Sequence, residues 1–320
     1  MSGEGSYHPS QDQLEIVGAV DDALVELLPL ARLHQSAEES ADVWTQLDGL
    51  GAFAISLGED AGGSGLGAAE EALIVLALGR RLASPTVLAT IGASHAGFEG
   101  TRAGASGTPR VAAGYRRGGK VVAVGDPDAA FLLLRETDGA ALYPAAAGAE
   151  LDGRNWVAKL ETIDALGEPL ARFDAKALLR LRLIDAAALA GVAQAALDMA
   201  VEYAQMRKQF GWPIGAFQAV KHHCANMAIG ARSARDQVSF AATAIDQGRE
   251  DAELAVESAL LVAGHAAIEN AGKNIQIHGG IGFSDEADPH LLVKRAQLLA
   301  TLAGGLEAAT DRLAALPPVH

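Results

Sequence analysis

Residues 203–218 read Tyr-Ala-Gln-Met-Arg-Lys-Gln-Phe-Gly-Trp-Pro-Ile-Gly-Ala-Phe-Gln, and residues 276–283 read Gln-Ile-His-Gly-Gly-Ile-Gly-Phe. The two motifs stand about seventy residues apart, and each comes at the end of a long segment with helical periodicity. The first contains a permanently charged arginine between aromatic residues. The second contains paired glycines, which stop a helix. The pattern predicts that both motifs lie at the ends of long helices.

The surrounding sequence, residues 171–320, has the pattern of a helical bundle. Asp174 can cap a first helix. In a third helix, apolar residues recur every seven positions, which is typical of a core or a subunit seam; they are Leu254, Leu261, Ile268 and Ile275. The expected helices are Ala175 to about Met206, about Ala216 to Gln247 before Gly248, about Asp251 to His278, His290–Leu302 and Leu306–Leu316.

Residues 1–105 and 106–170 differ from the bundle and from each other. In the first region, Ser10 can cap one helix and Ser36 another over Ala37–Leu50, and a third is expected over Ala68–Leu82. In the second, Asp138-Gly139 is a good hairpin turn, and the spacing predicts about four to six antiparallel strands. The strand candidates are Arg110–Tyr115, Lys120–Val124, Ala130–Arg135 and Ala140–Tyr143. The succession of helices, strands and helices predicts an α+β fold with three regions.

Bulk properties restrict the class of protein. The chain has 320 residues, of which 50% are hydrophobic, and a formal net charge of −15. This charge argues against a nucleic-acid partner, because phosphate binding needs clustered Lys and Arg. No apolar run reaches the roughly 18–20 residues of a membrane span. The start lacks the features of a secretion signal, and one cysteine forms no internal disulfide. We expect a cytoplasmic enzyme or enzyme subunit without a membrane partner.

The two motifs and the order of the regions resemble the acyl-CoA dehydrogenase family over nearly the whole chain. The stretch from Val43-Trp44 to Gly65 is also similar to that family. The resemblance implies an N-terminal helical domain (1–105), a shortened central β domain (106–170) and a C-terminal four-helix bundle (171–320). It implies FAD as cofactor, an acyl-CoA as substrate, a 2,3-enoyl-CoA as product, and an electron-transferring flavoprotein as the electron acceptor.

In this family each FAD lies across a subunit interface, and the two motifs hold the nucleotide half of the neighbour's flavin. By resemblance, Arg207 would supply a forked donor to the pyrophosphate, and Phe210 would pack on the cofactor. The glycines of the second motif would let the backbone come close. The cofactor-binding candidates are Arg207, Gln209, Phe210, Ile214, Phe217, Gln218, Gln276, Ile277, Gly279 and Gly280.

The sequence departs from the family at the catalytic base. The usual positions of the carboxylate correspond here to Leu181 and to Ala303 or Gly304, none of which accepts a proton. Asp185 and Glu307 are the nearest weak candidates to replace it. We therefore expect this chain to carry no catalytic residue, since a base must come within roughly 3 Å of the proton it takes.

A second departure concerns the flavin ring. The family's ring-binding motif, of the type Thr-Glu-Pro-x-x-Gly-Ser, is absent between Ser106 and Leu170. This combination resembles the short subunits of heteromeric, steroid-CoA type acyl-CoA dehydrogenases. It implies a longer sister subunit that supplies the base and the ring site, in an α2β2 assembly. The missing second site would leave room for a bulky acyl group. The alternatives are a self-sufficient homodimer that uses Asp185 or Glu307, and a non-catalytic scaffold protein.

Several other features have plainer interpretations. The glycine-rich stretch 58–67 lacks the ending of a P-loop and is expected to be an ordinary loop. His222, His223 and Cys224 are consecutive on a helix and point about 100° apart, so we expect no metal site. Arg180 and Arg182 are expected to lie on an exposed helix face, which is the more common place for such residues; the alternative is that they approach an acyl-CoA or a partner.

Overall fold

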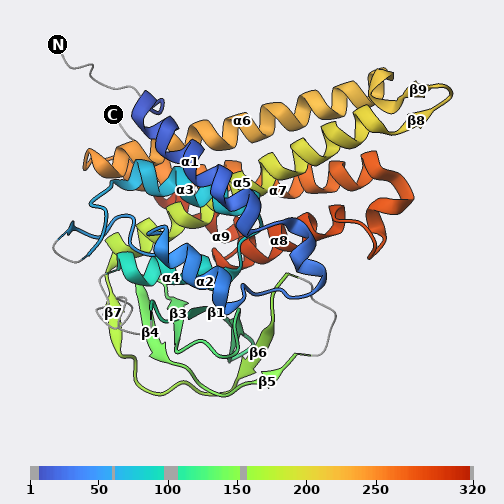
Figure 1. Ribbon diagram of the computed structural model, residues 1–320. Helices are drawn as coiled ribbons and strands as arrows, with labels where there is room; N and C mark the ends of the chain where they lie inside the picture. Colours follow the sequence, from blue (N-terminus) through green and yellow to red (C-terminus); the bar gives the residue numbers. More distant parts are fainter. Residues whose placement is uncertain (1–6, 60–61, 97–106, 152–156, 318–320) are drawn as a thin grey trace, which may run out of the picture.

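Three long helices dominate the computed structural model, which describes residues 7–59, 62–96, 107–151 and 157–317. They are α5 (Ala175–Met206), α6 (Gln218–Asp246) and α7 (Ala252–His278). Figure 1 shows them side by side on one side of the molecule, with the β-sheet on the other. The Asp174 side chain accepts a hydrogen bond from the Ala177 N–H, so the predicted cap of α5 is confirmed.

The remaining helices come from both ends of the chain. The C-terminal ones are α8 (Pro289–Leu302) and α9 (Leu306–Ala315). The N-terminal ones are α1 (Gln11–Leu27), the short 3₁₀ helix η1 (Leu30–His34), α2 (Ala41–Gly49), α3 (Ala68–Arg80) and α4 (Pro85–His95).

One sequence-based expectation for the N-terminal helices was wrong, and one helix was missed. Helix α2 begins at Ala41, because the Ser40 hydroxyl, not that of Ser36, accepts the hydrogen bond that caps it. The Ser36 side chain closes a turn with Glu38 instead. Helix α4 was not predicted, although Ser84 followed by Pro85 is a typical helix start. Residues 85–94 are all buried, so α4 lacks the one-sided apolar pattern that marks a surface helix.

Helix α5 is the centre of the core. A Cβ on Gly191 would lie 2.1 Å from the Leu76 carbonyl oxygen, and one on Gly79 would lie 2.3 Å from that of Ala188. These glycines therefore let α3 and α5 pack backbone to backbone. By length and composition α5 could cross a membrane, but 72% of its apolar window is buried inside the protein. Burial to this extent is typical of a helix at the centre of a folded core.

The strands form one mixed sheet within the described residues. They are β1 (Val111–Arg117), β2 (Lys120–Val124), β3 (Phe131–Arg135), β4 (Ala140–Pro144), β5 (Ala149–Glu150), β6 (Leu160–Ile163) and β7 (Ala171–Phe173). Their order is β5-β6-β2-β1-β3-β4-β7. The β3–β4 hairpin around Asp138-Gly139 is confirmed.

Six described strands, β1 to β6, lie within residues 106–170, so the expected count of four to six is confirmed, whereas the expectation of a purely antiparallel region was wrong. The described sheet has seven strands, and β3 pairs with β1 in parallel. The chain leaves the β1–β2 hairpin and crosses to the far side of β1 before it forms β3, so the two strands run the same way. The predicted boundary between residues 105 and 106 lies outside the described residues, as do residues 60–61 of the glycine-rich loop.

Helix α4 connects the two layers. A Cβ on Gly92 would meet the side chains of Leu181 on α5 and Leu133 on β3. Helix α4 is thus packed between the bundle and the sheet, where Figure 1 shows it above the strands. Helix α4 therefore fixes the sheet against the bundle.

Candidate functional site

The two sequence motifs meet at one end of the bundle. Helices α5 and α7 end there and α6 begins there, on the right in Figure 1. The rings of Tyr203 and His278 stack with their centroids 4.0 Å apart. Burial lowers the pKa of His278, which favours the neutral ring. The two motifs, which are separated in the sequence by α6 and most of α7, therefore form one surface.

The first motif forms a tight hairpin that projects from this surface. Strands β8 (Lys208–Gln209) and β9 (Trp212–Pro213) are joined by a two-residue turn. Its central residues, Phe210 and Gly211, have φ angles of 53° and 84°. The left-handed region is unfavourable for a bulky aromatic residue, yet the Phe210 side chain is 89% exposed. The chain gains no burial of its own from this strained residue.

The other aromatic and polar candidates of the first motif surround this hairpin. The ring of Phe217 lies edge-on to that of Phe210, with centroids 6.3 Å apart. Gln218 is exposed at the start of α6, and Ile214 packs partly against the core. The Gln209 amide donates to the neighbouring Lys208 carbonyl.

Arg207 supplies the positive charge of the surface. Its backbone is fixed, because its N–H donates to the Tyr203 carbonyl at 2.8 Å and its carbonyl accepts from Ile214 at 2.7 Å. Its side chain is exposed and has no acidic partner within the part of the chain that the structure describes. A guanidinium without a partner, on a fixed backbone, is suited to bind an external anion.

The second motif contributes an open stretch of backbone. Gly279 has φ 66°, and the sharp turn there ends α7. A Cβ on Gly279 or Gly280 would meet nothing within 4 Å among the described residues. Gln276 is exposed, whereas Ile277 is buried in the core, so any contact of Ile277 with a cofactor is through its backbone. The turn is followed by the short helix η5 (Gly279–Phe283).

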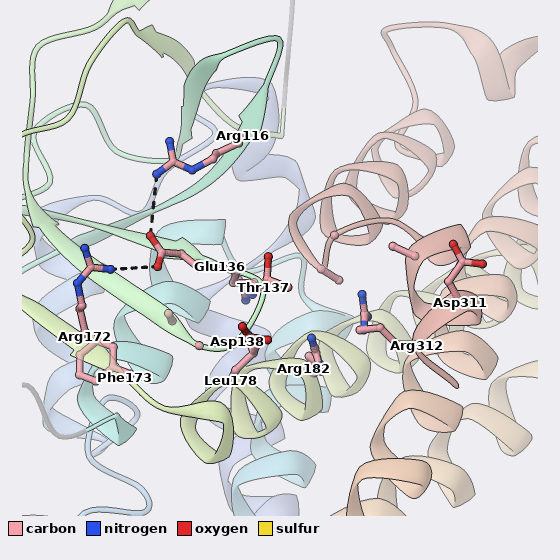
Figure 2. Close-up of a pocket in the computed structure, with 16 residues that line it drawn as sticks. Arg116, Glu136, Thr137, Asp138, Arg172, Phe173, Leu178, Arg182, Asp311 and Arg312 are labelled. Carbon is pink, nitrogen blue, oxygen red and sulfur yellow. Dashed lines mark hydrogen bonds and ion pairs between the residues drawn. The ribbon is translucent and has the colours of Figure 1, made fainter. Parts of the chain in front are cut away.

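A second candidate site is a cleft of about 950 Å³ at the junction of sheet and bundle. Figure 2 shows the β3–β4 hairpin on one side and α5, the α8–α9 loop and α9 on the other. Ala303 and Gly304 line this cleft, whereas Leu181 is buried beside α4 and does not. The cleft thus contains one of the two places where the resemblance puts a base, with no carboxylate at that place.

The two weak candidates for a base lie elsewhere. Asp185 is 2% exposed and accepts a hydrogen bond from Arg135 at 2.7 Å. Burial raises the pKa of Asp185 to about 6, against the opposing effect of Arg135. Glu307 is exposed in the first turn of α9 and is not part of the cleft wall. The structure brings neither carboxylate to the surface of the cleft.

Helix α5 carries two arginines that were expected to be exposed, and this was wrong. Arg180 is 5% exposed and pairs with the buried Glu71. The Arg182 side chain is 11% exposed and pairs with Glu257 at 2.7 Å. Both carboxylates come from distant helices, so the sequence around residue 180 gave no sign of them. These arginines neutralise carboxylates in the interior of the bundle.

The glycine-rich loop proved to be a structural connection between helices. The first two N–H groups of α3, of Ala68 and Ala69, donate to the carboxylate of Asp246 at 2.6 and 2.9 Å. A helix start that could attract an external anion is therefore satisfied by a side chain of α6. No group of three or more His, Cys, Asp or Glu side chains is placed to hold a metal ion in the described ranges.

A polar cluster inside the molecule was also missed by sequence reasoning. Glu38 and Glu39 lie beside the start of α4, where Thr86 donates to Glu38 at 2.7 Å and Ser84 donates to Glu39. Burial, and then the charge of Glu39, raise the pKa of Glu38 to about 7. The fully buried Arg295 of α8 is nearby, and burial lowers its pKa to about 10. This cluster joins the N-terminal helices to the bundle.

Comparisons with known proteins agree with this geometry. The model of the acyl-CoA dehydrogenase C-terminal domain matches residues 172–315, and that of the N-terminal domain matches residues 10–104. Acyl-CoA dehydrogenase IpdE2 of Mycobacterium tuberculosis is 33% identical over 264 residues, which are 79% of each chain. The chain belongs to the acyl-CoA dehydrogenase family. Members of this family are FAD-dependent flavoproteins, and membership indicates that the chain belongs to an oxidoreductase that acts on an acyl-CoA.

Solved structures show the same fold. The ChsE4–ChsE5 complex from Mycobacterium tuberculosis matches with a TM-score of 0.78 and 22% identity, over 98% of this chain and 100% of that one. A Tcur3481–Tcur3483 steroid acyl-CoA dehydrogenase matches with a TM-score of 0.76 and 24% identity, over 95% and 97%. The predicted architecture of N-terminal helices, central sheet and C-terminal helices is confirmed.

Proposed function

We propose that this chain is the short subunit of a heteromeric acyl-CoA dehydrogenase, and that its bundle end holds the nucleotide half of an FAD whose ring lies in a sister subunit. One observation carries the proposal: Phe210 is 89% exposed in a left-handed turn, beside an arginine without a partner. Strain of this kind costs about 1–3 kcal/mol and persists where function requires it. A ligand or neighbouring chain that covers Phe210 would explain it.

The residues at the bundle end fit the nucleotide half of FAD. Arg207 would bind the pyrophosphate through its forked donors, and Phe210 with Phe217 would cover an apolar part of the cofactor. The open backbone at Gly279 and Gly280 leaves space for a group that does not belong to this chain. When bound, FAD supplies the acceptor for the hydride that leaves the acyl-CoA. The residues of this chain bind and orient it.

The junction cleft supports a division of labour between two subunits. Ala303 and Gly304 hold no proton acceptor, and Asp185 is buried in an ion pair with Arg135. The base would therefore come from the longer sister chain, in an α2β2 assembly. The fold shared with a steroid acyl-CoA dehydrogenase supports a bulky, steroid-derived acyl-CoA as the substrate. Electron transfer to an electron-transferring flavoprotein, and a cytoplasmic location, complete the proposal.

The proposal is tested by the affinity of the co-expressed complex for FAD. Arg207→Ala removes a charge-assisted contact to phosphate, so we expect FAD to bind about 10 to 100 times more weakly. The matched control is Arg249→Ala, which removes another arginine from the opposite end of α6, where it pairs with Asp251. Equal FAD affinity in the two variants would overturn the proposed role of the bundle end and favour a scaffold.

Expression of the chain alone distinguishes a homodimeric enzyme from the proposed heteromer. Such an enzyme would retain FAD and reduce a dye in the presence of an acyl-CoA. It would also lose its activity in Asp185→Asn or Glu307→Gln. We expect the chain alone to show neither bound FAD nor dye reduction.

A further inference from the structure

The junction cleft has an unusual distribution of charge. On the bundle side, the fully buried Glu257 is the partner of two arginines. Arg312 donates to it from Nε at 2.8 Å and from Nη2 at 2.9 Å, and Arg182 Nη1 lies 2.7 Å away. One carboxylate cannot neutralise two guanidinium groups. This group of three side chains therefore carries one positive charge, and the carboxylates of Glu253 and Asp185 also act on Arg182.

The sheet side repeats the arrangement. Glu136 accepts a hydrogen bond from Arg172 at 3.2 Å and lies 3.9 Å from Arg116, as Figure 2 shows. The side chains of Arg116 and Arg172 are 59% and 63% exposed, so both can move toward a ligand. Again one carboxylate faces two guanidinium groups.

Free donors accompany this charge. Arg312 uses Nε and Nη2 for Glu257, and its Nη1 is 3.9 Å from the place where a Cβ on Gly304 would be. Arg135, which also lines the cleft, pairs through Nη2 with Asp185. Its buried Nε and Nη1 have no acceptor among the described residues. A buried donor that lacks an acceptor destabilises the protein, and an added acceptor removes this cost.

Two acidic residues in the lining oppose an anion. Asp138 and Asp311 are both exposed at the rim. Charges that are exposed to water interact weakly, and the same interaction is several-fold stronger near partly buried groups. The buried Arg182–Arg312–Glu257 group therefore outweighs the rim acids for a ligand that enters the cleft.

We propose that the junction cleft binds a small dianion, either a dicarboxylate or a phosphate, between the Arg182–Arg312 wall and the Arg116–Arg172 wall. Guanidinium groups bind both oxyanions through paired N–H donors, and in each wall two of them share a single carboxylate partner. This site is separate from the bundle end. It has cationic groups around Gly304, where the family resemblance would place a proton-accepting carboxylate.

The test is calorimetric titration of the full chain, in the assembly in which it purifies, with succinate and with inorganic phosphate at low ionic strength. We expect saturable binding of at least one of them. Arg312→Gln removes donors on one wall, and Arg172→Gln, at a side chain that is 63% exposed, removes donors on the other. Each is expected to weaken binding about 10 to 100 times, and Arg249→Gln to leave it unchanged.

Comparison of the two anions identifies the kind of ligand that the cleft binds. Preference for succinate identifies a dicarboxylate site, and preference for phosphate identifies a phosphate site. Absence of saturable binding for both, or equal binding by the wild type and both cleft variants, would overturn the inference. The outcome does not depend on FAD, so a failed FAD experiment with Arg207→Ala leaves this test valid.

Discussion

Replacement of Glu38 by glutamine tests whether the polar cluster at the start of α4 limits stability at neutral pH. The half-buried Glu38 accepts one hydrogen bond, from Thr86, and its Oε1 atom has no partner among the described residues. Burial, followed by the charge of Glu39, raises the pKa of Glu38 from 4.5 to about 7. In Glu38→Gln the group cannot ionise, so the cost of a buried charge disappears.

The direction in which stability changes with pH follows from proton linkage. A carboxyl group whose pKa is higher in the folded state takes up a proton on folding, so its contribution to stability is complete below pH 4.5. It is then lost as the pH rises to about 7. This rise in pKa corresponds to about 3 kcal/mol. Since part of the side chain reaches solvent, we expect Glu38→Gln to be about 1 to 3 kcal/mol more stable than the wild type at pH 8, and equal to it near pH 4.5.

The assay is urea unfolding of the wild type and the variant at several pH values from 4.5 to 8, followed by circular dichroism. The control is Glu26→Gln, which changes an exposed glutamate of α1. The reasoning would be refuted by a stability difference that stays constant across this pH range. It would also be refuted by a variant that loses stability at pH 8.

The remaining predictions concern packing, turn strain and capping. Gly191→Ala should destabilise the protein by about 3 kcal/mol, because its Cβ would lie 2.1 Å from a carbonyl of α3. Gly18→Ala, in open space on α1, should stabilise the protein by about 0.5–1 kcal/mol. Thermal unfolding of the two variants should therefore show a lower midpoint for the first and a higher one for the second. Phe210→Gly should stabilise the chain by about 1 kcal/mol and weaken FAD binding in the complex, whereas a loss of both properties would show that the turn serves only folding. Asp246→Ala should cost about 1–2 kcal/mol by chemical denaturation, since it removes the cap of α3; an unchanged midpoint would contradict this.

Local sequence signals predicted the bundle well. The first residue of α5 follows the capping Asp174, and α7 ends where Gly279 takes a positive φ, as the sequence indicated. These features depend on residues next to one another in the chain, so a sequence carries them directly. The family motifs indicated that both segments lie at the bundle end, where the structure stacks the rings of Tyr203 and His278.

Features that depend on distant residues could not be predicted. The parallel pairing of β1 and β3 depends on how the chain crosses the sheet, which no turn signal encodes. Arg182 looked like a solvent-facing arginine, because its partner Glu257 lies on another helix. The same holds for the charge of the junction cleft, which arises from pairs between separate elements.

The most direct test of the proposed function is the flavin content of the two assemblies. The chain expressed alone and the complex with its longer sister chain would be compared by flavin absorbance and native mass spectrometry. The account predicts no FAD in the chain alone and one FAD for each pair of unlike subunits. One FAD per copy of this chain in the absence of the sister would contradict it, because the ring would then have a complete site within this polypeptide.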